Sequence, residues 1–274
     1  MRTLIYQCWD GEEKQGNLAG IEFMKEYAKK INADHIYDHN SFFKTNLGKY
    51  SPNYGKFKCL FDYNDYDFIM YADCDLVPKS NCNENIFEYF SKLDKEFGIC
   101  EENKAPTLRK SFTIGEGINN HNDERWVALV EKKWKIKLPR TNDGLPKVFN
   151  SGMMLWSRSG FFKARKKFLD FKDYVKFCNN NFLPSFYSCD QHYIHAMMLI
   201  CEFDWTIIDS KWNSLIHYHP GAMEEPRPII DLRGAEYNFV HIQLHGADNW
   251  SKNKINQVVN LPISEWNFQD FIFN

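Results

Sequence analysis

The chain has 274 residues, of which 43% are hydrophobic and 16% aromatic, so it can bury a sizeable core. Its formal net charge of −2 excludes a protein that an overall positive field holds on nucleic acid. We expect no transmembrane segment, because no window approaches about 18 consecutive apolar residues, and no signal peptide, because the first apolar run spans only residues 4–6. Eight cysteines without a C-x-x-C pair argue against zinc. Because we expect no secretion signal, we also expect reduced thiols and a cytoplasmic protein.

The first 75 residues alternate between strand and helix patterns. Residues 4–9 and 35–37 have the composition of strands, and residues 18–31 carry apolar side chains at helical spacing. Residues 54–63 follow as a second helix, which leads into an apolar strand at residues 68–72. This order predicts a parallel α/β sheet whose ligand site lies at the carboxyl ends of the strands.

The second half of the chain is less regular. We predict helices at 84–97, 123–137, 161–177 and 188–200, a loop at 101–117, and strands at 148–156, 205–208 and 239–244. The sequence contains no internal repeat, low-complexity tract or Gly/Ser-rich linker. We therefore expect residues 1–274 to form a single domain.

Two carboxylates directly follow the strand at residues 68–72. Asp73 and Asp75 stand two positions apart, so in an extended segment their side chains project to the same side. Two hard oxygen ligands at a strand end suit a divalent cation that keeps positions open for substrate phosphates. The alternative interpretation is a plain strand followed by an acidic turn.

Four later segments carry polar residues in a comparable setting, namely 149–156 (FNSGMMLW), 189–192 (CDQH), 212–213 (WN) and 240–246 (VHIQLHG). Together with the Asp-x-Asp segment, and in the same order, they resemble the motifs of GT-A glycosyltransferases. The resemblance is strongest to retaining family 8, which includes glycogenin and bacterial galactosyltransferases. It covers residues 3–252 through short motifs rather than continuous similarity.

The resemblance implies an α/β fold of the GT-A (Rossmann-like) type, with a central, mostly parallel sheet flanked by helices. Residues 1–100 would form the nucleotide-sugar-binding half and residues 101–274 the acceptor-side half. The implied reaction moves a sugar from a nucleotide-diphosphate donor, expected to be a UDP-sugar, to an acceptor hydroxyl with retention. We expect a glycan or lipopolysaccharide-type saccharide as the acceptor rather than DNA.

The family pattern also implies a metal site for Mn²⁺ (or Mg²⁺) with a histidine as the third ligand. We expect His245 to join Asp73 and Asp75, because it sits at a strand end beside Gly246; His241, on the same strand face, is the alternative. The chain departs from the family where a Lys-Pro-Trp is expected, since residues 248–250 read Asp-Asn-Trp. Lys252 is the candidate substitute for that lysine at the diphosphate.

Further residues take roles at the donor by the same resemblance. Asn150, Asp190 and Gln191 would orient the sugar; their plain interpretations are a bulged strand and an acidic first helical turn. Lys56 lies 17 positions before the Asp-x-Asp segment, where the family places a basic donor contact. Gln7 and Asp10 lie where the base-binding loop would be, or are simply part of a polar loop after a strand.

The stereochemistry leaves alternatives open. Asp190 is a better nucleophile than Gln191, while in an internal-return path the leaving diphosphate itself deprotonates the acceptor. An inverting enzyme would instead need a carboxylate base, for which Asp123, Glu124 and Asp143 are candidates.

Three other functions compete with this interpretation. The basic clusters at 132–137 and 163–167 could track a phosphate backbone, as in a DNA glycosyltransferase of the same fold. Exposed tryptophans such as Trp126, Trp134 and Trp250 could stack on sugars in a non-catalytic binding module. A nucleotidyltransferase or phosphohydrolase is disfavoured, because the sequence has no glycine-rich phosphate loop.

Overall fold

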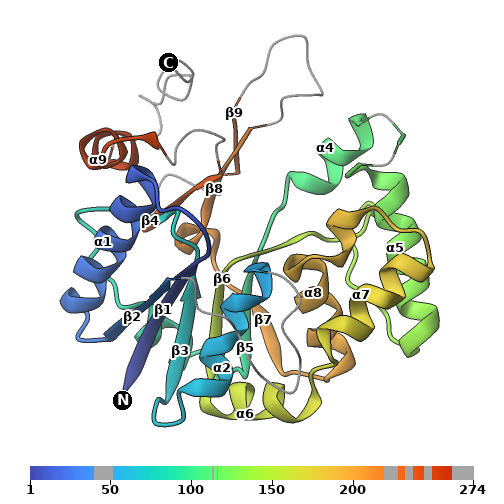
Figure 1. Cartoon of the computed structure of the whole chain (residues 1–274), viewed down its shortest axis with the longest axis horizontal. Helices are drawn as coiled ribbons and strands as arrows, with labels where there is room; N and C mark the ends of the chain where they lie inside the picture. Colours follow the sequence, from blue (N-terminus) through green and yellow to red (C-terminus); the bar gives the residue numbers. More distant parts are fainter. Residues whose placement is uncertain are drawn as a thin grey trace.

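A central sheet with helices on both faces forms the body of the protein, as the computed structural model shows (Figure 1). The structure describes residues 1–39, 52–112, 114–115, 117–218, 228–231, 237–243 and 249–260. Among these residues, no helix is long and apolar enough to cross a bilayer. All eight cysteines are described; they are free thiols, and most of them are buried.

The central sheet has the strand order β2-β1-β3-β6-β5-β7. Its described strands are β1 (Thr3–Trp9), β2 (Asp34–His39), β3 (Phe68–Ala72), β5 (Phe97–Glu101), β6 (Phe149–Ser157) and β7 (Trp205–Ile207). The pairs β1–β2, β1–β3 and β5–β7 are parallel, while β6 runs antiparallel to both β3 and β5. The predicted α/β class with a mostly parallel sheet is confirmed.

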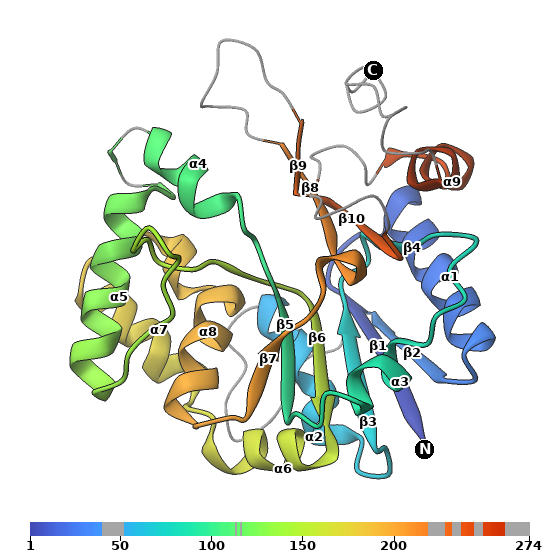
Figure 2. The same cartoon turned by 180° about the vertical axis from the view of Figure 1, so that it is seen from behind.

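A second, smaller sheet lies over the carboxyl ends of the central parallel strands (Figures 1 and 2). It contains β4 (Leu76–Pro78), β10 (Phe239–Gln243), β8 (Ser214–Tyr218) and β9 (Pro228–Asp231), in that spatial order. The sequence predicted β10 but not the other three. Its important property is that β4 begins directly after Asp75 and pairs with β10, which comes from the far end of the chain.

Two hydrophobic cores cover the two faces of the central sheet. Alternate residues of a strand point to opposite faces, so Leu4 and Tyr6 pack in one core while Ile5 packs in the other. The helices on the first face are α2 (Cys59–Asp62), α5 (Asn120–Trp134), α6 (Arg158–Lys167), α7 (Phe171–Asn180) and α8 (Asp190–Ile200). Those on the second face are α1 (Gln15–Lys30) and α3 (Ile86–Ser91).

Four predicted elements need correction. The helix expected at 84–97 ends at Ser91, Asp94 takes a left-handed backbone with φ of 50°, and β5 begins at Phe97. The loop expected at 101–117 contains α4 (Ala105–Ser111). The helix expected at 161–177 is two helices, because the side chain of Asp170 caps α7 by accepting from the N–H of Lys172. The helix expected at 54–63 is a 3₁₀ segment (Pro52–Lys58) followed by α2.

Candidate active site

A cavity of about 520 Å³ opens at the carboxyl ends of the central strands. Strands and helices from both halves of the chain contribute to its walls. Seven residues selected from the sequence line it, namely Asp10, Lys56, Asp73, Asp75, Asn150, Asp190 and Gln191. Positions spread over some 180 residues therefore meet at one site, where a sheet of this class usually binds its ligand.

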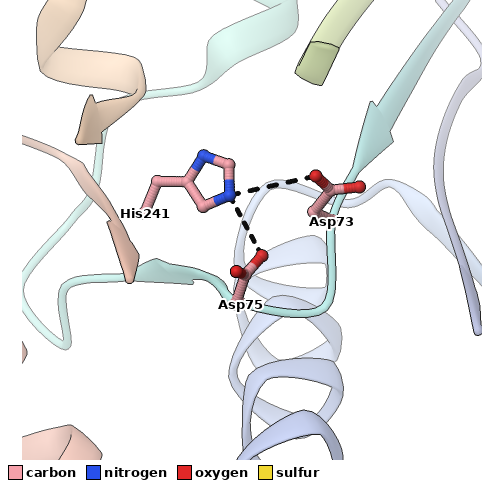
Figure 3. Close-up of side chains that lie close together, drawn as sticks. All are labelled: Asp73, Asp75 and His241. Atoms are coloured by element: carbon pink, nitrogen blue, oxygen red, sulfur yellow. Dashed lines mark hydrogen bonds and ion pairs between the residues drawn. The ribbon is translucent and has the colours of Figure 1, made fainter. Parts of the chain in front are cut away.

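A cluster of three potential metal ligands forms where the turn between β3 and β4 meets β10 (Figure 3). Nε2 of His241 lies 3.0 Å from Oδ1 of Asp75 and 3.9 Å from Oδ2 of Asp73. Their potential ligand atoms all lie within 4.8 Å of one another. Two carboxylates and one imidazole at this spacing fit a single divalent cation such as Mn²⁺ or Mg²⁺.

The backbone of the two sheets fixes the three ligands. The N–H of Asp73 donates to the carbonyl of Gly152 at 2.8 Å, which ties the end of β3 to β6. The N–H of Ile242 donates to the carbonyl of Asp75 at 2.9 Å, and His241 pairs with Leu76 in the β4–β10 ladder. This register brings His241, from the last strand of the small sheet along the described sequence, next to the turn that carries Asp73 and Asp75.

Two glycines make room for this arrangement. A Cβ atom on Gly152 would stand 2.2 Å from Cε1 of His241 and 2.7 Å from Oδ2 of Asp73. A Cβ atom on Gly20 of α1 would stand 1.8 Å from the carbonyl oxygen of Cys74. Both positions therefore need a residue without a side chain, one beside the ligands and one behind the acidic turn.

His241 is fully buried, and its surroundings favour the charged ring when no metal is bound. Burial alone lowers the pKa of His241, but the carboxylates of Asp75 and Asp73 outweigh it, so the pKa lies above the usual histidine value. The predicted alternative ligand is thus the histidine that the structure brings to the two aspartates. His245 and Gly246 lie outside the described residues.

Lys56 is a buried residue of the cavity lining. Its ammonium lies 2.6 Å from Oδ2 of Asp190 and 3.4 Å from Oδ1 of Asp73. Burial lowers the pKa of Lys56, but the Coulomb attraction of the two carboxylates outweighs it, so the pKa is raised and the side chain stays charged. Ser151 donates to the same Oδ2 of Asp190 at 2.6 Å, so the first residue of α8 is held on two sides.

A buried carboxylate that the sequence did not reveal lies behind Asn150 and Gln191. Oε1 of Glu102 accepts from Nδ2 of Asn150 at 2.9 Å and from Nε2 of Gln191 at 3.4 Å. Glu102 directly follows β5, at the same sheet edge as Asp73. A carboxylate directly after a strand was the signal that could have identified Glu102. It was not recognised because the sequence did not predict β5.

Two of the predicted donor contacts have other partners. Gln7 is fully buried: its Nε2 donates to the carbonyl of Asp73 at 3.2 Å, and its Oε1 lies 2.9 Å from the His35 ring. The Lys252 ammonium lies 2.9 Å from Glu22 and 3.0 Å from Glu26 of α1, and Lys252 is not among the residues that line the cavity. Their predicted roles at the donor stay predictions, and these contacts argue against them.

Some of the residues behind the competing functions are placed less favourably for those functions. Trp126 and Trp250 were expected to be exposed, but they are 2% and 5% exposed, because their rings pack in the core. In the basic cluster at 163–167, Lys163 pairs with Glu96 at 2.6 Å, and Arg165 donates to the carbonyl of Leu60. Lys163 and Arg165 thus bind their own chain, whereas Lys166 and Lys167 are exposed.

Comparison with known proteins supports the fold. No protein-family model matches the chain, and no curated protein is detectably similar in sequence. Mouse xyloside xylosyltransferase 1 in its apo form is similar in structure, with a TM-score of 0.53 at 14% identity over 89% of this chain and 98% of that chain. An active-site variant of LgtC gives 0.50 at 12% identity over 96% and 98% of the two chains.

These neighbours are glycosyltransferases of the GT-A class, and the chain has the GT-A fold. At such low identity the likeness establishes the fold, and it confirms the architecture that the short motifs predicted. The chemistry has to be argued from the cavity and its side chains.

Proposed function

We propose that the chain is a metal-dependent glycosyltransferase that moves a sugar from a nucleotide-diphosphate donor to an acceptor hydroxyl. One observation carries the proposal. In a GT-A fold, Asp73, Asp75 and the buried His241 converge beside a 520 Å³ cavity that the two aspartates line, next to the buried ion pair of Lys56 and Asp190. A binding module would not need this set of charged groups.

The three clustered side chains would hold Mn²⁺ or Mg²⁺, and oxygen ligands with one imidazole favour Mn²⁺. A bound cation of this kind supplies electrostatic stabilisation of the diphosphate as the nucleotide leaves. Lys56 adds a second positive charge within 3.4 Å of Asp73, so the diphosphate would lie between two cationic groups. We take UDP as the nucleotide, on the strength of the sequence resemblance.

A polar part of the cavity wall would orient the sugar. Asn150, Asp190 and Gln191 line this wall, and Glu102 fixes two of them from behind. Retention follows if the acceptor oxygen attacks the anomeric carbon on the face that the diphosphate leaves. The carbon–phosphate oxygen bond then breaks, the new glycosidic bond forms, and the acceptor proton passes to the leaving diphosphate. Lys56 keeps Asp190 ion-paired, which favours this path over nucleophilic attack by Asp190.

A saccharide is the favoured acceptor. The mouse neighbour is named a xyloside xylosyltransferase, and part of the basic surface that DNA would need is paired internally. We expect a glycan or lipopolysaccharide-type saccharide.

A thermal-shift measurement tests the proposal. UDP, GDP and CDP are compared, each with and without Mn²⁺, on the wild type, on Asp75→Ala and on the exposed control Asp65→Ala. One nucleotide should raise the melting temperature only with Mn²⁺, in the wild type and in Asp65→Ala but not in Asp75→Ala. If no nucleotide gives a metal-dependent shift in the wild type, the proposal is wrong.

A further inference from the structure

A chain of hydrogen bonds between buried side chains ends on the histidine of the candidate metal site. Nδ2 of Asn150 donates to Glu102 at 2.9 Å, Nδ2 of Asn213 donates to Oδ1 of Asn150 at 3.0 Å, and Nδ1 of His241 lies 2.9 Å from Oδ1 of Asn213. None of these four residues is more than 4% exposed. Water therefore has little access to exchange with these contacts, and each bond keeps its partner.

The direction of the first bond is fixed from both sides. The backbone N–H of Gly152 donates to Oδ1 of Asn150 at 2.9 Å, and a backbone N–H can only donate. On the other side, the Glu102 carboxylate accepts from Nδ2. Reversing the amide of Asn150 would oppose donor to donor at Gly152, so its orientation follows from its partners.

The orientation of Asn150 in turn fixes the orientation of Asn213 and the protonated nitrogen of the imidazole. Since Oδ1 of Asn150 is an acceptor, Asn213 must present its Nδ2 there, and its Oδ1 then faces His241. A carbonyl oxygen only accepts, so Nδ1 of His241 carries a proton. Nε2 is then the nitrogen of the neutral ring whose lone pair faces the two aspartates.

The alternative tautomer would leave the metal site without its histidine ligand. With the proton on Nε2, the ring would donate to Asp75 across the 3.0 Å that separates them, and it would offer no lone pair to a cation. Asn213 and Asp75 thus compete for the single ring proton of neutral His241. His241 can bind a metal through Nε2 only if the proton stays on Nδ1, where it is donated to Asn213.

We propose that Asn213 is a positioning residue that fixes the Nδ1–H tautomer of His241 and thereby makes Nε2 a metal-binding atom. The inference rests on the proposed function in so far as a metal binds there. The tautomer itself is a property of the metal-free protein and can be measured without any ligand.

The decisive experiment is ¹H–¹⁵N long-range NMR of metal-free protein with ¹⁵N-labelled histidine, at a pH where the ring is neutral. The His241 signals are assigned by their loss in His241→Gln. The wild type should show the Nδ1–H form, and Asn213→Leu should change to the Nε2–H form. Asn213→Asp keeps an acceptor for Nδ1 and should restore the Nδ1–H form. Asn122→Leu, a buried asparagine of α5 outside the chain of bonds, is the control and should leave the signals unchanged.

Mn²⁺ affinity gives a second readout, taken from the electron paramagnetic resonance signal of the free ion. Asn213→Leu should bind Mn²⁺ about 10- to 100-fold more weakly, as second-shell losses usually do. Asn213→Asp and Asn122→Leu should stay close to the wild type.

An Nε2–H tautomer in the wild type, or an Nδ1–H tautomer in folded Asn213→Leu, would overturn the inference. If Asn213→Leu does not fold, the wild-type spectrum alone decides. If the wild type binds no Mn²⁺, the proposed function fails, and the spectra still decide the role of Asn213.

Discussion

Replacing Gly152 by alanine should disable the metal site through a single methyl group. The new Cβ would stand 2.2 Å from Cε1 of His241, whereas ordinary carbon contacts begin near 3.5 Å. The ring must therefore retreat by about 1 Å, or β6 must move. Ligand distances in metal sites tolerate about 0.2 Å, so such a shift takes His241 out of coordination range.

The expected cost has two parts that separate measurements can resolve. Overpacking of this kind typically costs about 1–3 kcal/mol, which corresponds to a melting temperature lower by several degrees. The Mn²⁺ affinity should fall by at least about tenfold, as it does when a ligand's support is lost. Calorimetric unfolding gives the first number, and Mn²⁺ titration followed by electron paramagnetic resonance gives the second.

Gly55 offers a matched control. A Cβ atom there would meet only the Sγ of Cys8 at 3.6 Å, an ordinary contact, although Gly55 directly precedes Lys56. Gly55→Ala should therefore keep both stability and Mn²⁺ affinity. The reasoning is refuted if Gly152→Ala behaves like Gly55→Ala in both measurements.

Three further predictions concern charge. Lys56→Met should lower the free energy of unfolding by about 3–5 kcal/mol, because it leaves the buried Asp190 carboxylate without its cationic partner. Lys58 is more exposed, so Lys58→Met should cost less in the same denaturant titration. Burial, and to a smaller extent the positive charge of Arg109, lower the pKa of His195 to about 3. Unfolded chains take up this proton below about pH 6.5 and the folded protein does not, so stability should fall by about 2 kcal/mol between pH 6.5 and pH 5. His195→Leu should show less of this fall, and equal slopes would contradict the assignment. EDTA should abolish the nucleotide-induced thermal shift and excess Mn²⁺ should restore it, whereas a shift that survives EDTA would exclude a metal-dependent donor site.

Local patterns were enough to predict the acid-bearing strand and its surroundings. The apolar run at residues 68–72 and the helical spacing at 18–31 are properties of short segments, and both correspond to observed elements, β3 and α1. The pairs Asp73/Asp75 and Asp190/Gln191 lie at strand and helix ends that such patterns mark. They line the cavity as the sequence suggested.

The choice between His241 and His245 depends on information that no short segment holds. Both histidines fall on one face of the predicted strand at 239–244 and its end, and it is the pairing of His241 with Leu76 that places this histidine on the acidic turn. Glu102 escaped notice for a related reason. It stands next to Glu101, which pairs with Lys147 at 2.8 Å, and only the direction of β5 sends the second carboxylate toward Asn150.

The contact between Asp75 and His241 spans 166 positions of the sequence. A bound ion that strengthens this contact would act as a cross-link that closes a very long loop. The entropy cost of loop closure in the unfolded chain rises with loop length, so such a cross-link is expected to stabilise the fold. An ion bound there would tether the end of the chain to its first third, much as a disulfide does in an oxidising compartment. Chelation should therefore loosen the whole fold, and the amides of β4 and β10 should exchange hydrogen faster once the ion is removed.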